Sequence, residues 1–201
     1  MQLTVITAET FPGNEASVLN RLFERGMSRL HLRKPQASEK ELHTLLSQID
    51  ERFHERIVLH DRFSLLDAFR LGGVHLNRRN PVRPEGKGLF ASRSCHSLEE
   101  LKTAGGYDRI FLSPVFDSIS KPGYPHAFSH EALLSAKAAG WINGQTVALG
   151  GVHAGTIPLA AAYGFGGVAV LGALWGGYPE DRDEKALLER LDNLLALTRA
   201  Q

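Results

Sequence analysis

The sequence has little of what marks secreted, membrane-spanning or nucleic-acid-binding proteins. It contains a single cysteine, Cys95, so no intrachain disulfide can form and no cysteine-rich zinc site exists. No apolar run approaches the roughly 20 residues of a membrane span. The formal net charge is +1, without a basic run, and this gives no indication of nucleic-acid binding. The first residues read as a strand and are too short for a signal peptide, so we expect a cytoplasmic protein without membrane or nucleic-acid partners.

What is present suits one globular domain over residues 1–201. Hydrophobic residues make up 43% of the chain and charged residues 22%, a balance that allows a large core to be buried. The length lies at the short end of the range for a (β/α)8 barrel. No linker, repeat or low-complexity segment indicates a second domain. The sequence leaves open whether the chain forms a homo-oligomer.

Apolar segments alternate with amphipathic ones along the whole chain. Strands are predicted at residues 3–7, 29–33, 56–60, 74–76, 88–92, 109–115, 145–150 and 167–171. Helices are predicted at residues 14–25, 38–53, 63–71, 98–104, 129–139 and 180–199. Such alternation implies parallel strands with right-handed crossovers. The predicted fold class is therefore α/β, a single-domain (β/α)8 TIM barrel with parallel strands, with a doubly wound open sheet as the alternative.

Two glycine-containing turns follow the last two predicted strands. The first contains Gly150 and Gly151, and the second contains Leu171, Gly172 and Ala173. In a (β/α)8 barrel the loops after strands seven and eight often hold a phosphate, and glycine lets backbone N–H groups approach its oxygens. We expect these residues to bind a phosphate. The alternative is that the glycines only turn the chain.

Polar side chains gather at the ends of the other predicted strands, which converge on one face of a barrel. His31, Arg33, His60 and Asp61 follow the second and third strands, and His75 lies in the fourth. Each has a structural alternative: Arg33 pairs with a carboxylate, Asp61 caps a helix, and the histidines pack at strand ends. Convergence of so many polar residues favours a site.

These segments, in this order, resemble the thiamin phosphate synthase/TenI family over nearly the whole chain. The segments that carry the resemblance are His31-Leu32-Arg33-Lys34-Pro35, His60-Asp61-Arg62, Gly73-Val74-His75-Leu76-Asn77-Arg78-Arg79-Asn80, Ser94-Cys95-His96-Ser97, Ser113-Pro114-Val115-Phe116-Asp117-Ser118-Ile119-Ser120-Lys121, Leu149-Gly150-Gly151-Val152 and Gly167-Val168-Ala169-Val170. The glycine motifs are weak singly, whereas the ordered set is specific.

The resemblance implies one of two reactions on a thiazole phosphate. The synthase joins hydroxymethylpyrimidine diphosphate to thiazole phosphate and releases pyrophosphate, with Mg²⁺ as cofactor. The TenI-type tautomerase converts the thiazole phosphate carboxylate tautomer to its aromatic form and requires no cofactor. The resemblance further implies roles for individual residues: substrate binding by Arg33, His31, His60, Ser94, Ser118, Ser120 and Lys121, proton transfer by His96, and, in a synthase, Mg²⁺ binding by Asp61 and weakly by Asn80.

Departures from the family's pattern lead us to favour the tautomerase. The second acidic position is Asn80, and the lysine after the second strand is Pro35, although Lys34 beside it is a candidate substitute. His31 and His60 replace Gln and Asn. Histidine at position 96 suits proton transfer near neutral pH. The synthase remains the first alternative, a non-catalytic thiazole or thiamin phosphate-binding protein the second, and a sugar-phosphate epimerase is disfavoured because only Asp61 is placed as an acid.

Overall fold

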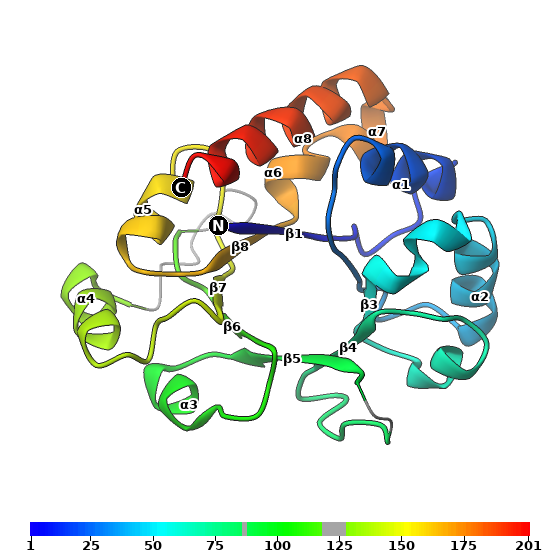
Figure 1. Ribbon diagram of the computed structural model, residues 1–201. Helices are drawn as coiled ribbons and strands as arrows, with labels where there is room; N and C mark the ends of the chain where they lie inside the picture. Colours follow the sequence, from blue (N-terminus) through cyan, green and yellow to red (C-terminus); the bar gives the residue numbers. More distant parts are fainter. Residues whose placement is uncertain (86–87, 118–127) are drawn as a thin grey trace.

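The computed structural model describes residues 1–85, 88–117 and 128–201. Its eight parallel strands close into a barrel surrounded by helices (Figure 1). The strands are β1 (Gln2–Ile6), β2 (Leu30–Leu32), β3 (Ile57–Leu59), β4 (Gly73–Leu76), β5 (Phe90–Cys95), β6 (Arg109–Leu112), β7 (Thr146–Ala148) and β8 (Gly167–Val170). β1 pairs with β8 from Gln2↔Gly167 to Val5↔Val170. This closure confirms the (β/α)8 barrel, because an open doubly wound sheet would leave two edge strands unpaired.

Helices follow most of the strands on the outside of the barrel. They are α1 (Glu15–Glu24), α2 (Glu39–Ser47), α3 (Leu98–Thr103), α4 (His130–Ala138), α5 (Ile157–Ala162), α6 (Gly172–Trp175), α7 (Tyr178–Asp181) and α8 (Glu184–Arg199), with 3₁₀ helices η1 (Glu51–Arg56) and η2 (Phe63–Asp67). Within the described part of the chain, none of these helices has the length and apolar character needed to span a membrane.

Two of the predicted helices are each split by a side-chain cap. The helix predicted at 38–53 ends at Ser47, and Asp50 Oδ1 then accepts a hydrogen bond from Arg52 N at 3.0 Å to begin η1. The helix predicted at 180–199 breaks at Arg182, which has φ +56°, and Asp183 Oδ1 accepts from Ala186 N at 3.0 Å to begin α8. Short Asp side chains that bond nearby N–H groups offer the backbone an alternative to a continuous helix.

The fifth strand begins and ends later than predicted. It covers Phe90–Cys95 instead of 88–92, because its pairing with β6 continues to Cys95↔Leu112. Ser92 and Ser94 therefore share one face of β5, since alternate strand residues point the same way. Both reach the barrel interior, where they bond His75.

The barrel interior has an apolar half and a polar half. Ile6, Phe111, Val147 and Ala169, from β1 and β6–β8, form a small apolar cluster. Buried polar residues from β2, β4 and β5 are His31, His75 and Ser92. The larger core lies between the barrel and its helices, where each fully buried aliphatic side chain contributes about 1.5–3 kcal/mol. The polar half of the interior is where the chain departs from an ordinary barrel core.

Candidate functional site

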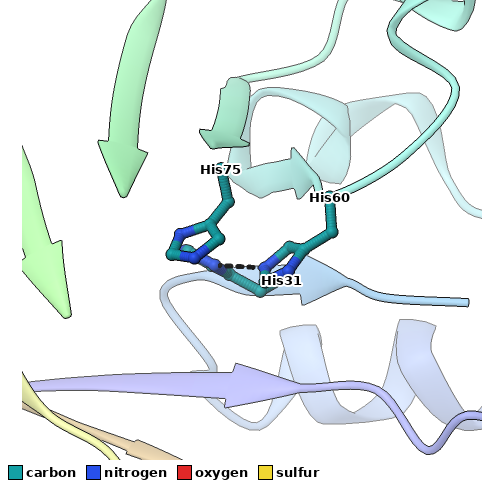
Figure 2. Close-up of side chains that lie close together, drawn as sticks. All are labelled: His31, His60 and His75. Atoms are coloured by element: carbon teal, nitrogen blue, oxygen red, sulfur yellow. Dashed lines mark hydrogen bonds between the residues drawn. The ribbon is translucent and has the colours of Figure 1, made fainter. Parts of the chain in front are cut away.

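Three histidines from neighbouring strands meet inside the barrel (Figure 2). His31 lies in β2, His60 directly follows β3, and His75 lies in β4; their exposed fractions are 0%, 5% and 1%. His31 Nδ1 lies 2.9 Å from His60 Nε2. The rings of His60 and His75 are stacked, with centroids 4.2 Å apart. We call these three residues the histidine cluster. They are packed at the strand ends, as one interpretation of the sequence held. His31 and His60 also share a hydrogen bond, and His75 contacts both rings.

Burial keeps the histidine cluster uncharged. It lowers the pKa of His31 and His60 well below the ordinary value of 6.5, and it lowers the pKa of His75 to about 3. The pKa of His75 is lowered further by the positive charge of Arg33. Ser92 Oγ and Ser94 Oγ each lie 2.8 Å from one ring nitrogen of His75. Neutral imidazoles in such surroundings act as hydrogen-bond partners or metal ligands and do not serve as cations at neutral pH.

The carboxylate predicted to bind Mg²⁺ is occupied by protein groups. Asp61 Oδ1 accepts a hydrogen bond from Asn80 Nδ2 at 2.9 Å and lies 3.1 Å from Arg79 in an ion pair. Asn80 Nδ2 also donates to His60 O at 2.9 Å, so the amide presents its N–H₂ to Asp61. Mg²⁺ requires oxygen ligands. Asp61 and Asn80, as they are arranged in this structure, do not fit a Mg²⁺ site, because a guanidinium and an amide donor stand at the carboxylate.

The residues after β2 are held by carboxylates. Arg33 forms an ion pair with Glu9, as one interpretation of the sequence held. Lys34 Nζ lies 2.7 Å and 2.8 Å from the two oxygens of Glu15, and both side chains are buried. Burial raises the pKa of Glu15 to about 7, although the charge of Lys34 acts in the opposite direction. Lys34 therefore stabilises the packing of α1 against the strand ends and does not replace the lysine that Pro35 displaces.

The two glycines after β7 are required by packing. Gly150 and Gly151 have φ +90° and +65°. A Cβ at Gly150 would lie 2.8 Å from Pro114 Cα, and one at Gly151 would lie 2.2 Å from Asp117 O. The interpretation that these glycines turn the chain is thus supported at β7. Their N–H groups remain candidates for phosphate binding, but a bulky substitution at Gly151 would displace the segment after β6 and is no clean test of binding.

The turn after β8 leads into the short helix α6. Leu171 O accepts from Leu174 N at 3.1 Å and from Trp175 N at 3.0 Å. The N–H groups of Gly172 and Ala173 precede this pattern and have no partner within the helix, as at every helix N-terminus. β7 and β8 are paired neighbours, so both glycine turns lie at adjacent strand ends. Phosphate binding by these residues stays a prediction.

His96 lies at the rim, beside a pocket of about 270 Å³ after β4 and β5. The lining of this pocket includes Asn77, Arg78, Arg93 and Ser94. His96 Nδ1 lies 3.0 Å from Ser113 O. Because a carbonyl oxygen only accepts, Nδ1 carries the proton and Nε2 is left as the basic nitrogen. Ser94, which bonds His75, connects this pocket to the histidine cluster.

Sequence reasoning did not identify every residue of the site. Arg78 and Arg79 were named only within the motif that ends at Asn80, and Arg93 was not named as a site residue. Their positions could have been found from the strands that precede or contain them. Cys95 is buried in the outer core, away from the interior that Ser94 faces. Ser118, Ser120 and Lys121 lie outside the described residues, so their predicted contact with substrate stays a prediction.

Comparisons with known proteins agree with the motifs. The model of the TMP-TENI family, described as thiamine monophosphate synthase, matches residues 3–174. A thiamine-phosphate synthase from Marinobacter nauticus is 30% identical over 149 residues, 70% of this chain and 65% of that protein, just under two thirds of its length. A putative thiamine-phosphate synthase from Geobacter sulfurreducens is 31% identical over 159 residues, which make up 75% of this chain and 73% of that protein.

A solved structure shares the whole fold. The thiamine phosphate pyrophosphorylase from Bacteroides thetaiotaomicron is 37% identical, with a TM-score of 0.90, and the match covers 100% of this chain and 99% of that one. The thiamine phosphate pyrophosphorylase from Pyrococcus furiosus is 21% identical, with a TM-score of 0.76 over 99% of this chain and 96% of that one. The second likeness is evidence for the fold alone.

The buried pair of Lys34 and Glu15 generates a stability prediction. Lys34→Met leaves an unpaired carboxylate in the interior, so we expect the free energy of unfolding at pH 8 to fall by about 3–5 kcal/mol. The loss should be smaller at pH 5, because the Glu15 carboxyl, whose pKa is about 7, is then protonated and leaves no unpaired charge. A carboxyl whose folded pKa is raised stabilises the fold below its unfolded pKa and loses that contribution as pH rises. Urea unfolding at both pH values measures this, with exposed Lys40→Met as the control. Equal losses at pH 5 and pH 8 would contradict it.

Proposed function

Because the chain belongs to the thiamine monophosphate synthase family, we propose that it acts on thiazole phosphate in thiamin biosynthesis. The family match spans both glycine turns, which lie at adjacent strand ends of the closed barrel. Backbone N–H groups of Gly150, Gly151, Gly172 and Ala173 would receive the phosphate oxygens, since charge-assisted bonds to backbone N–H suit a dianion. Of the reactions open to such a protein, the relatives' names favour synthesis over the tautomerisation that the departures in sequence suggested.

The phosphate site can be tested through charge at Ala173. Ala173→Asp places a carboxylate beside the proposed phosphate, so we expect thiazole phosphate to bind at least about tenfold more weakly than to Ala173→Asn, which adds a side chain of the same shape without charge. The difference should shrink at high salt. Calorimetric titration of both variants measures it. Equal affinities for the two would place the phosphate elsewhere.

The first candidate reaction is therefore thiamin phosphate synthesis. The carbon–oxygen bond of hydroxymethylpyrimidine diphosphate breaks, diphosphate leaves, and the thiazole nitrogen forms the new carbon–nitrogen bond. The leaving group develops negative charge that must be met by cations. The observation that carries this proposal is the ion pair of Arg79 with Asp61. It puts a guanidinium at the position where the resemblance implies a metal ion, so that Arg79 can meet the charge of the leaving diphosphate. Arg33 and Arg79 both lie close enough to His60 to lower its pKa.

Guanidinium groups suit this role because their planar N–H donors bind phosphate oxygens in pairs. Arg79 would exchange its exposed bond to Asp61 for one to the diphosphate, and Asp61 and Glu9 would keep the arginines in place until substrate enters. The neutral histidine cluster would offer hydrogen-bond donors and acceptors to the substrate from the barrel interior. No step in this proposal depends on Mg²⁺ bound by Asp61.

Asn80 is the residue at which metal dependence can be tested. The wild-type protein should bind Mg²⁺ weakly without diphosphate, because Arg79 and the Asn80 amide occupy Asp61. Asn80→Asp puts two carboxylates side by side, so we expect Mg²⁺ to bind about tenfold more tightly or better, since affinity rises with ligand charge. Calorimetry measures the affinity, and pyrophosphate release with and without Mg²⁺ measures the consequence. Asn193→Asp, at an exposed position on α8, controls for net charge. Tight Mg²⁺ binding by the wild type would overturn the proposal.

The second candidate reaction is tautomerisation of the thiazole phosphate carboxylate. One observation favours it: the bond from His96 Nδ1 to Ser113 O leaves Nε2 free to take a proton beside a pocket. A group that both accepts and returns a proton near neutral pH is what this reaction needs. It requires no metal, in keeping with the arrangement at Asp61.

His96→Asn distinguishes the two reactions. If His96 moves the proton, aromatisation of the tautomer followed by absorbance should slow by about 10²–10⁴-fold, while thiazole phosphate binding changes little. Cys95→Ala is the neighbouring control and should keep its activity. Pyrophosphate release from the two synthase substrates is assayed on the same preparations. Release without aromatisation supports synthesis, the reverse supports tautomerisation, and tight binding with neither activity identifies a non-catalytic binding protein.

A further inference from the structure

We propose that His31, His60 and His75 form a binding site for a divalent transition-metal ion such as Zn²⁺ inside the barrel. One ring nitrogen from each residue lies within 4.8 Å of those of the other two. Figure 2 shows the three rings turned toward one another from neighbouring strands. Three imidazoles with a further position for water or substrate are a known ligand set for zinc. The inference does not depend on the proposed function, because it concerns what the interior binds.

The hydrogen bonding of the cluster leaves a ligand position open. His31 is fully buried, and its Nε2 has no hydrogen-bond partner among the residues that the structure describes. A buried polar atom left unpaired costs about 1–3 kcal/mol, so a group that binds this nitrogen recovers that cost. When Nδ1 donates its proton to His60 Nε2, the lone pair of His31 lies on Nε2, and this nitrogen can bind a metal ion.

The other two histidines have bonds that a metal ion can replace or use. A tetrahedral zinc ion with bonds of about 2.0–2.1 Å holds its ligand nitrogens about 3.3 Å apart. The nitrogens here are up to 4.8 Å apart and two rings are stacked, so binding requires the imidazoles of His60 and His75 to rotate. His75 would exchange one of its serine bonds for the ion and keep the other, and a ring N–H bound to such a partner orients a metal ligand.

The surrounding charges permit a cation in this position. Arg33 and Arg79 stand nearby, but each is paired with a carboxylate, Glu9 and Asp61. Arg29 is a further positive charge that acts on His31, and the carboxylate of Asp108 offsets part of it. Three imidazole ligands favour Zn²⁺, Co²⁺ or Ni²⁺ and bind Mg²⁺ weakly, because Mg²⁺ prefers oxygen ligands. The ion proposed here is thus chemically distinct from the one that Asp61 fails to fit.

The sequence itself singles out two of the three ligands. His31 and His60 stand where the related pattern has Gln and Asn, whereas His75 belongs to that pattern. Two separate departures thus converge on the retained histidine in space, although 29 residues separate the first from the second. The pattern also supplies the test variants, His31→Gln and His60→Asn, which keep a polar side chain at each position.

The test is metal binding by the full chain after treatment with a chelator. We expect one Zn²⁺ per chain by calorimetry and, with Co²⁺, the intense visible absorption of a tetrahedral complex. His31→Gln and His60→Asn should each weaken binding by about 100-fold or more, beyond the 10–100-fold seen when a supporting residue is lost. His43→Gln, at an exposed position on α2, should bind like the wild type.

Stability gives an independent reading of the same variants. Saturating Zn²⁺ should raise the melting temperature of the wild type and of His43→Gln, because an ion that binds only the folded state stabilises it. It should not raise that of His31→Gln or His60→Asn. Failure of the wild type to bind one ion, or binding by both variants with unchanged affinity, would overturn the proposal. Neither result bears on thiazole phosphate turnover, so the two proposals can fail separately.

Discussion

The hydrogen bonds between β1 and β8 are the constraint on which the rest of this molecule depends. They join strands from opposite ends of the chain, beginning at Gln2↔Gly167, and so turn a sheet into a closed barrel. Closure brings the carboxyl ends of all eight strands to one mouth and shuts water out of the interior. The convergence of the polar residues and the neutral state of the buried histidines both follow from it.

Closure of the barrel separates an uncharged interior from a charged rim. Inside, the imidazoles are neutral: His31 and His60 share one hydrogen bond, and His75 bonds two serines of β5. Nε2 of His31 has no partner among the described residues. At the rim, Arg33 and Arg79 remain charged and pair with Glu9 and Asp61. Lys34 and Glu15 are the exception, a buried ion pair that fixes the start of α1 against the end of β2. The mouth therefore carries positive charge that suits an anion, whereas the interior below it presents uncharged imidazole nitrogens.

Much of this was accessible from sequence because strand patterns are local. The alternation of apolar segments located all eight strands and placed His31, His60 and His75 at their ends. The helix predicted from residue 38 begins there, where Ser38 and Glu41 form a capping box. What stayed hidden depends on contacts between segments. The pairing of Arg79 with Asp61 arises in the irregular stretch after β4, and the meeting of the histidines depends on the register between β2, β3 and β4.

The same distinction explains the errors at helix ends. Asp50 and Asp183 each begin a new helix by accepting a hydrogen bond from a nearby backbone N–H. The spacing of hydrophobic residues does not predict such a bond. Lys34 was a candidate for the missing lysine because it is adjacent in sequence. In the structure its ammonium group is buried against Glu15, a contact between segments that adjacency in sequence does not predict.

The packing of Gly150 and Gly151 against the backbone of Pro114, Phe116 and Asp117 has a consequence for how such motifs are inherited. A side chain at either position would separate two turns that lie in contact, so selection for folding alone retains the pair. A descendant that had ceased to bind any phosphate would keep both glycines. In this chain, then, the glycine pair follows from the packing of the two turns, and the capacity to hold an anion has to be judged from the residues around it.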